Sequence, residues 1–271
     1  MIKLLKKSAT VALSIITAIF AFVPESVFGM IKLLPKTSNE VNIILNRVLA
    51  LIIVFFISII INTLYFLCRR SILIKGNNYK IKIKYGNLFK MRNCKKIIPF
   101  DECFTTRVGD SPADIKHSSI CGQYLDENPI SNMQDLIDKA QLKPARSRSQ
   151  YKNKERYESG RLVSNDDYLL MPFAKLNKDG LGIISRKEYL DCLSTMWEEI
   201  NKYYGQKDVC IPILGSGITR MNDELLTQQQ LLDMIIVSYK LSSHKIKLPH
   251  KLIIVCKRND DFSINKIGEY I

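Results

Sequence analysis

One stretch of this sequence combines residue types that could bind an anion. Residues 211–220 read Ile-Pro-Ile-Leu-Gly-Ser-Gly-Ile-Thr-Arg, an apolar run that ends in Gly-Ser-Gly and is followed by a helical pattern. Glycines at such a junction let the backbone turn its N–H groups toward an anion, and a nearby helix N-terminus favours phosphate. We interpret the stretch as a candidate phosphate-binding loop. A tight turn between a buried strand and a helix is the alternative, because the motif completes neither a P-loop nor a dinucleotide fingerprint.

The elements around this loop alternate between strands and helices, which predicts an α/β sandwich. The last strand candidates are nearly continuous apolar runs, which is typical of a central sheet covered on both faces. Open sheets of this kind bind ligands at the carboxyl ends of their strands, so this context favours the phosphate interpretation. Thr227 and Gln230 match a capping box at the start of the last helix. The expected strands are residues 79–85, 95–100, 168–176, 209–214 and 251–256, and the expected helices are residues 132–140, residues 189–204 and the segment after Thr227.

Two apolar runs precede the α/β pattern. The second, residues 48–68, contains no charge and is long enough to span the ~30 Å hydrocarbon core of a bilayer. The first covers about residues 8–28 but is interrupted by Pro24 and Glu25, so a spanning helix and a secretory signal peptide are both compatible with it. Basic residues flank both runs, and positive charge marks the cytoplasmic side. The simplest topology is a two-helix hairpin with both ends in the cytoplasm.

Polar residues occur within the second run, namely Ser58, Asn62 and Thr63. In lipid such side chains pair across helices or bond to their own backbone, so self-association through them is one of two interpretations. The apolar cores, residues 9–23 and 48–68, carry no charge. This argues against a proton- or ion-coupled transporter.

Composition narrows the classes of partner. The chain has 271 residues and a formal net charge of +14, which indicates contact with lipid headgroups, nucleic acid or a phosphorylated ligand. Its seven cysteines include no C-x-x-C pair and it has three histidines, so the spacings predict no zinc or other metal site. The apolar settings of Cys192, Cys210 and Cys256 indicate reduced thiols in a cytosolic compartment.

Residues 141–164 differ in composition from their surroundings, with seven Lys and Arg against two Glu and few large apolar residues. We interpret them as a mobile basic insertion, either a solvated loop or a lid over an anionic ligand or membrane surface. Nucleic acid is disfavoured as a partner, because Tyr151 and Tyr157 are the only stacking residues in the insertion and no recognised motif is present.

Several segments together resemble one family. They are the two apolar runs, residues 97–104 (Ile-Ile-Pro-Phe-Asp-Glu-Cys-Phe), residues 118–124 (Ser-Ser-Ile-Cys-Gly-Gln-Tyr) and residues 211–220. They are similar to the membrane-anchored macro-domain effectors (ThsA) of Thoeris antiphage defence, over most of the chain. The resemblance implies a macro-domain-like, three-layer α/β/α sandwich with a mixed sheet over residues 76–271. A two-helix transmembrane hairpin, with helices at about 8–28 and 48–68, would precede it within residues 1–75.

The resemblance also implies a sensor of a nucleotide signal rather than an enzyme. In that family a TIR-domain partner detects infection and consumes NAD to make an ADP-ribose-type signalling nucleotide, cyclic or linear, and histidine-ADP-ribose is the form implied here. The macro domain binds this signal without a further cofactor. The protein then oligomerises and disrupts the bacterial inner membrane, in which it is a multi-pass protein with a cytoplasmic C-terminal domain. Lipid, the signal and other copies of the chain are thus the implied partners, and nucleic acid is not among them.

The resemblance assigns ligand-binding roles to three segments. The phosphate loop would hold the diphosphate, residues after the strand at 97–100 would contact adenine and the first ribose, and a second loop would complete the site. Arg220 could instead pair with Asp223. The implied residues are Gly215, Ser216, Gly217, Ile218, Thr219 and Arg220, then Asp101 and Phe104, then Ser119, Ile120, Cys121, Gly122 and Gln123.

The sequence departs from macro-domain hydrolases at two points. Asp101-Glu102-Cys103 stands where those enzymes carry an Asn-containing loop, and their triple-glycine loop is reduced to Gly122. Both departures favour binding without turnover, and they leave a membrane-anchored hydrolase of ADP-ribose or its conjugates as the alternative. Asp101 and Glu102 could act as general acid or base, but the sequence pairs them with no nucleophile or metal. A structural membrane protein that recruits a protein partner is a third possibility.

Overall fold

The computed structural model describes residues 2–111, 113–217, 219–221, 226–259 and 262–267. The chain divides into two compact units, Met1–Arg69 and Arg70–Ile271. This division lies earlier than the predicted boundary at 75/76, because Ser71–Gly76 forms strand β1 of the C-terminal sheet.

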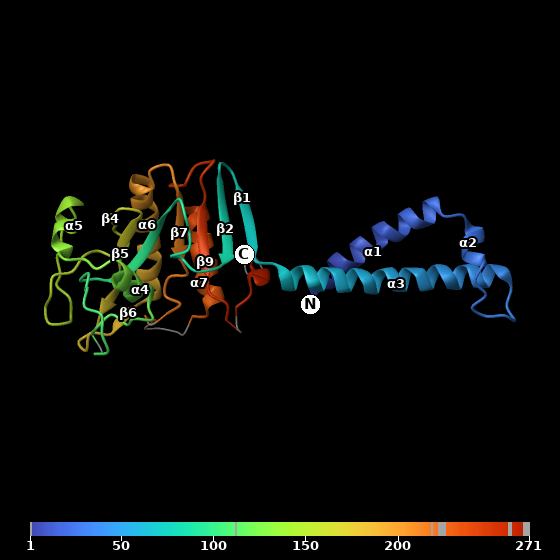
Figure 1. Cartoon of the computed structure of the whole chain (residues 1–271), viewed down its shortest axis with the longest axis horizontal. Helices are drawn as coiled ribbons and strands as arrows, with labels where there is room; N and C mark the ends of the chain where they lie inside the picture. The colour runs from blue at the N-terminus through green and yellow to red at the C-terminus, as the bar shows by residue number, and fades with distance from the viewer. Residues whose placement is uncertain (1, 112, 218, 222–225, 260–261, 268–271) are drawn as a thin grey trace. The chain divides into compact units, whose positions relative to one another are not determined.

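The N-terminal unit contains three helices, α1 (Ile2–Phe22), α2 (Glu25–Gly29) and α3 (Asn39–Cys68). By length and composition, Leu4–Phe22 and Asn39–Cys68 can each cross a membrane. The first helix ends at Phe22 rather than near residue 28, because Pro24 disfavours helical geometry in the residue before it and begins α2. The second long helix, α3, begins at Asn39 rather than at residue 48. The Ser38 hydroxyl caps its first turn by accepting the Val41 N–H. Figure 1 shows α1 and α3 side by side.

Polar side chains join the two long helices at one end of the hairpin. The Ser58 hydroxyl donates to the Ser8 carbonyl at 3.0 Å, and the Asn62 amide donates to the Ser8 hydroxyl at 3.3 Å and to the Ser58 carbonyl at 2.9 Å. All three residues are buried. Asn62 thus bonds to its own helix and also across to α1 of the same chain, and self-association through these residues stays a prediction.

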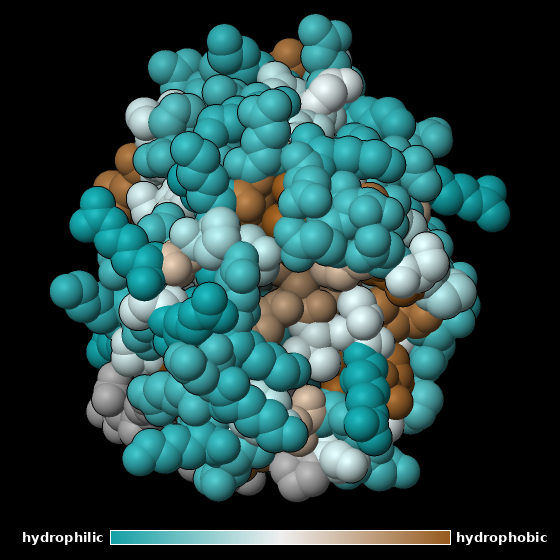
Figure 2. Space-filling model, turned by 90° about the vertical axis from the view of Figure 1, so that its left-hand side faces the viewer, coloured by the Kyte–Doolittle hydropathy of each residue, from teal (hydrophilic) through white to brown (hydrophobic). Residues whose placement is uncertain are grey.

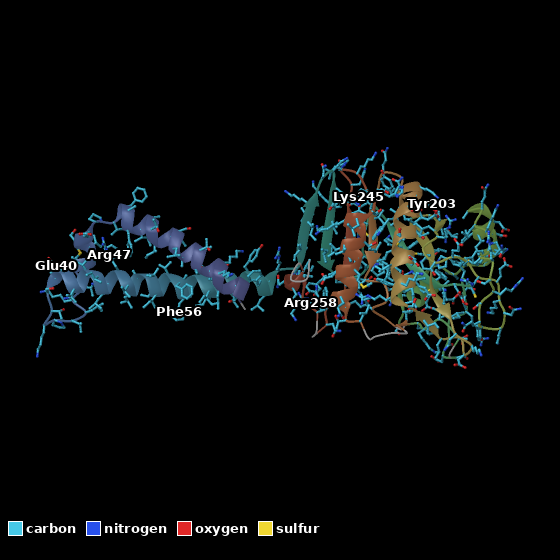
Figure 3. The ribbon with its side chains drawn as sticks, turned by 180° about the vertical axis from the view of Figure 1, so that it is seen from behind. Glu40, Arg47, Phe56, Tyr203, Lys245 and Arg258 are labelled. Atoms are coloured by element: carbon cyan, nitrogen blue, oxygen red, sulfur yellow. The ribbon has the colours of Figure 1, made fainter. Side chains whose placement is uncertain are left out.

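The other end of the hairpin is closed by Arg47. Its guanidinium forms a 3.0 Å ion pair with Glu25 of α2 and lies over the rings of Phe20 and Phe28. Figure 3 shows Arg47 where α2 meets α3, and Phe56 on the side of α3 away from α1. Arg47, the basic residue directly before the apolar run, is thus neutralised locally, which lowers the cost of placing it near lipid.

Substitution of Asn62 by leucine is expected to loosen the hairpin by about 1 kcal/mol, because interhelical hydrogen bonds in membranes have this magnitude. Unfolding by SDS titration in mixed micelles, followed by circular dichroism, measures the change. Thr63→Val is the matched control, because Thr63 lies beside Asn62 but outside this cluster. Equal resistance of the Asn62→Leu variant and the unaltered chain would show that the cluster does not stabilise the hairpin.

The C-terminal unit is built on one mixed sheet in the order β1-β2-β9-β7-β3-β5-β6-β8, with β4 paired to β5. Its central strands run parallel, whereas β1 is antiparallel to β2, and β4 and β6 are each antiparallel to β5. All the expected strands are present, with ends shifted by two residues at most. The strands are β2 (Tyr79–Tyr85), β3 (Cys94–Asp101), β4 (Val163–Asn165), β5 (Tyr168–Leu176), β6 (Gly182–Ile184), β7 (Asp208–Pro212), β8 (Arg220–Met221) and β9 (Leu252–Cys256).

Helices cover both faces of the sheet. On one face, α6 (Arg186–Tyr203) and α7 (Gln228–Leu241) pack on a core that includes Ile97, and on the other, α4 (Ile120–Glu127) and α5 (Met133–Lys139) pack on a core that includes Ile98. Successive residues of β3 thus face opposite layers, as strand alternation requires. The capping box of Thr227 and Gln230 begins α7 as expected. The predicted three-layer α/β/α sandwich is confirmed.

Hydrogen bonds and an ion pair to Glu102 hold the basic insertion at residues 141–164 against the domain, which corrects the prediction that it is mobile. The buried carboxylate of Glu102 accepts bonds from the Ser149 hydroxyl and the Leu176 N–H and lies 3.5 Å from the Arg156 guanidinium. Tyr157 is buried, and its N–H donates to the Glu102 carbonyl at 2.8 Å. Figure 2 shows the end of the domain that carries α5 and this insertion, where hydrophilic residues cover most of the surface.

Candidate functional site

A cavity of about 710 Å³ opens at the carboxyl ends of β3, β5, β7 and β9. Asp101, Leu176, Pro212 and Val255, at or near the ends of these four strands, all line it. Its volume is in the usual range for small-molecule sites, and its position is the one expected for an open α/β sheet.

The Gly-Ser-Gly segment forms one wall of this cavity. The Ser216 N–H and hydroxyl both bond to the Ile213 carbonyl, at 3.4 and 2.7 Å, so the chain turns sharply after β7. Gly215 has φ +77°, a conformation that favours glycine. A Cβ atom at Gly217 would meet no atom within 4 Å, so this position borders open space. The segment is therefore both the tight turn and a cavity wall.

A second wall is the first turn of α4, in a region where the sequence predicted only a loop. The Ser119 hydroxyl caps the helix by accepting the Gly122 N–H at 2.9 Å, and it donates to the Lys116 carbonyl at 2.7 Å. Ser119, Ile120, Cys121 and Gln123 all line the cavity. The N-terminal end of α4, which carries partial positive charge, thus borders the same space as Gly217.

Two predicted residues lie outside the cavity wall and have packing roles. A Cβ atom at Gly122 would lie 2.2 Å from the Lys116 carbonyl oxygen, so this glycine lets α4 approach the preceding backbone rather than a ligand. Phe104 is 3 % exposed and packs against Phe100 and Tyr157. It therefore supports the strand behind the cavity.

Asp101 lies at the cavity with part of its carboxylate already engaged. Its Oδ1 accepts the Cys103 N–H at 2.8 Å and the Thr105 N–H at 3.2 Å, which holds the turn after β3. Burial raises the pKa of Asp101 above its usual value. Burial likewise raises the pKa of the Cys121 thiol, so this cavity-lining cysteine is not an activated thiolate. Among the described residues, no group of three or more His, Cys, Asp or Glu could hold a metal ion.

Asp101→Asn is expected to keep the fold and to change its pH dependence. Asparagine can accept the same two N–H bonds, but it cannot carry the charge that burial penalises. With a raised folded pKa, the native chain binds more protons than the unfolded chain, so the contribution of Asp101 to stability falls as pH rises from 3.8 through that pKa. Thermal unfolding at a series of pH values should show the variant gaining stability relative to the unaltered chain over this window. A difference in stability between the two chains that stays constant across pH would contradict the raised pKa of Asp101.

The last members of the predicted loop are described only in part. Thr219 lines the cavity, and Arg220 begins β8, which pairs in parallel with β6 through Ile183. Ile218 and Asp223 lie outside the described residues.

Four further segments line the cavity that the sequence analysis did not single out. They are residues 86–89 after β2, residues 113–116 before α4, residues 180–182 before and within β6, and residues 257–259 after β9. Gly86 and Gly180 were available signals, and Gly180 has φ +82° with a would-be Cβ 2.6 Å from that of Ala113. Only the order of strands in the sheet shows that these segments meet at one edge.

The C-terminal unit has a mixed sheet between two helical layers and a ligand-sized cavity at the carboxyl ends of its parallel strands, as expected of a macro domain. The family model "Thoeris protein ThsA, Macro domain" matches residues 81–257. The Thoeris protein ThsA of Bacillus amyloliquefaciens (strain Y2) is 31% identical over 272 residues, which cover 96% of this chain and 88% of the relative. The chain belongs to the Thoeris ThsA family, as the sequence segments predicted.

Solved macrodomains of Oceanobacillus iheyensis are also similar to this chain. A glycine-to-valine mutant with ADPR aligns with a TM-score of 0.45 and 8% identity, over 70% of this chain and 91% of that one. An aspartate-to-alanine mutant aligns with a TM-score of 0.44 and 9% identity, over the same shares.

Proposed function

We propose that this chain is a membrane-anchored effector of Thoeris antiphage defence whose macro domain binds an ADP-ribose-derived signal. One observation carries the proposal: the Gly-Ser-Gly turn and the N-terminal end of α4 line the same cavity. Backbone N–H groups at a glycine turn and at a helix N-terminus both favour phosphate oxygens. A diphosphate has the charge and size to lie between them.

The rest of the cavity suits the remainder of a nucleotide. Asp101 and residues 86–89 form the part that would take adenine and the first ribose, since carboxylate and backbone groups there can accept and donate hydrogen bonds. Lys257 and Arg258 also line the cavity and add positive charge. The Arg258 guanidinium lies over the Tyr85 ring at 5.2 Å, and Figure 3 labels it.

The signal is histidine-ADP-ribose, made from NAD by a TIR-domain partner. Its binding favours an oligomeric state of the membrane hairpin that disrupts the bacterial inner membrane. For this, the ligand must bind the active state more tightly than the resting one. Family membership and the two apolar helices support this scheme. The basic residues after α3 support a cytoplasmic macro domain.

The macro domain acts as a sensor and not as a hydrolase. Glu102 is buried among Ser149, Arg156 and the Leu176 N–H, and it is absent from the cavity wall. The Cys103 thiol has its pKa raised to about 11, chiefly by burial. One observation favours the hydrolase alternative: Asp101 is a cavity carboxyl with a raised pKa, and such a group could serve as a general acid.

Calorimetry and chromatography on the full chain in detergent micelles separate these functions. ADP-ribose and histidine-ADP-ribose are titrated in turn, and the nucleotide is recovered after hours with stoichiometric protein. Saturable heat with intact ligand is the expected result. Loss of the ligand would establish the hydrolase, and the absence of binding for both compounds would overturn the proposed sensor.

A further inference from the structure

An unbroken run of basic charge follows the second membrane-spanning helix. No acidic residue occurs between Glu40 and Asp101. The interval after α3 holds ten basic residues: Arg69, Arg70, Lys75, Lys80, Lys82, Lys84, Lys90, Arg92, Lys95 and Lys96. The net charge of the chain is therefore concentrated in the segment that leaves α3.

Strand pairing gathers four of these lysines on one face of the sheet. Lys75 of β1 stands opposite Lys80 of β2, Leu73 opposite Lys82, and Ser71 opposite Lys84. The alternate residues Ile72, Ile74, Ile81 and Ile83 pack on the core beneath α6 and α7. Because neighbouring strand residues point to opposite faces, the four lysines share the other face. We call Lys75, Lys80, Lys82 and Lys84 the lysine face.

In the part of the chain that the structure describes, no member of the lysine face takes part in an ion pair. By contrast, Lys95 lies 3.8 Å from Asp167, and Lys96 lies over the Tyr168 ring. Like charges directly opposite each other, as at Lys75 and Lys80, destabilise a sheet. Such an arrangement is stabilised when an anionic partner neutralises it.

Protection of a sheet edge does not account for this pattern. Lysines on edge strands discourage pairing with other chains, but β1 is the edge strand and carries only Lys75. The other three lysines lie on β2, which is paired on both sides, with β1 and with β9.

We propose that the lysine face binds the anionic phospholipid headgroups of the membrane that α3 spans. Only Arg69 and Arg70 separate the end of α3 at Cys68 from the start of β1 at Ser71, so this part of the sheet begins at the membrane surface. Basic clusters directly after a spanning helix are attracted to anionic lipid within a Debye length. The inference rests on α3 as a membrane span but is independent of the ligand of the cavity.

Lysine acetylation of the full chain in nanodiscs tests the proposal. Nanodiscs of phosphatidylcholine alone are compared with nanodiscs that also contain phosphatidylglycerol, and a neutral acetylating reagent is followed by peptide mass spectrometry. Acetylation of Lys75, Lys80, Lys82 and Lys84 should slow several-fold in the anionic discs, and high salt should remove the difference. The exposed Lys139 and Lys178 should react equally in both. Equal rates for the lysine face in both lipids would overturn the proposal.

A pair of charge-matched variants sharpens the test. Combined Lys80→Gln, Lys82→Gln and Lys84→Gln should remove most of the lipid-dependent protection of Lys75. The control, Lys139→Gln, Lys178→Gln and Lys187→Gln, removes the same charge from other exposed positions and should leave that protection intact. Loss of protection in both variants would show an effect of net charge alone and overturn the assignment. A chain that enters nanodiscs of neither composition would refute α3 as a membrane span and overturn the proposal with it. Nucleotide binding, measured separately by calorimetry, tests the proposed sensor and does not depend on either result.

Discussion

Gly217→Glu is expected to abolish binding of ADP-ribose derivatives while leaving the domain folded. The new side chain would enter the open space beside the Gly-Ser-Gly turn, where a Cβ atom meets nothing within 4 Å. It would place a carboxylate where we propose the diphosphate lies. Loss of charge-assisted hydrogen bonds and the added repulsion should weaken binding on the order of 100-fold or more. Calorimetry on the full chain with histidine-ADP-ribose measures the effect.

Two further substitutions at this position separate charge from bulk. Gly217→Gln adds nearly the same volume without the charge, so it should weaken binding less than Gly217→Glu does. Gly217→Ala should weaken it least, because a single methyl group occupies little of the cavity. All three variants should unfold at temperatures close to that of the unaltered chain. Undiminished binding by Gly217→Glu would exclude the turn from the ligand site.

Gly122→Val is expected to unfold the region around α4 rather than to act on a ligand. Its Cβ atom would lie 2.2 Å from the Lys116 carbonyl oxygen and 2.9 Å from the His117 Cα, and both are backbone atoms that cannot rotate away. The helix would have to move away from the preceding segment and uncap at Ser119. We expect a loss of stability of about 3 kcal/mol or more, measured by thermal unfolding.

Valine at Gly217 and valine at Gly122 are expected to affect stability and binding differently. Gly217→Val adds the same side chain at a position with open space, so it should cost little stability but weaken nucleotide binding. Gly122→Val should lower both, because binding falls with the folded fraction. A Gly122→Val chain with a normal unfolding temperature would show that the Lys116 backbone can yield, and it would reopen a direct role for Gly122 at the ligand.

Short-range patterns in the sequence predicted most of the sandwich correctly. The strict alternation of Lys and Ile in β2 and the helical spacing of apolar residues in α6 follow from local geometry, so a single segment reveals them. The capping box of Thr227 and Gln230 is likewise local. Helix α4 escaped prediction, because it has only eight residues, contains Gly122 and directly follows Ser118 and Ser119, which is typical of a loop. Its helical form depends on the Ser119 cap and on burial of Tyr124 and Leu125 against the sheet.

The fold of the basic insertion likewise depends on contacts between residues distant in sequence. Its composition predicted mobility, since residues 141–164 contain few large apolar side chains. The acid that holds it, Glu102, lies far away in sequence and reaches Ser149 and Arg156 only once β3 has formed. Composition cannot reveal such a partner, because charge pairing across a fold depends on which strand ends lie side by side.

By itself, the sequence determined that the chain has two apolar helices, an α/β domain, a Gly-Ser-Gly turn after a buried strand and the segments that mark the Thoeris ThsA family. These features are periodicities and motifs within short windows. The tertiary structure decided which segments meet around the cavity, why Gly217 borders open space while Gly122 is packed on backbone, and how four lysines come to share one face with no ion pair among the described residues. Each of these depends on strand order and on contacts between residues distant in sequence, and such contacts exist only after the sheet has assembled.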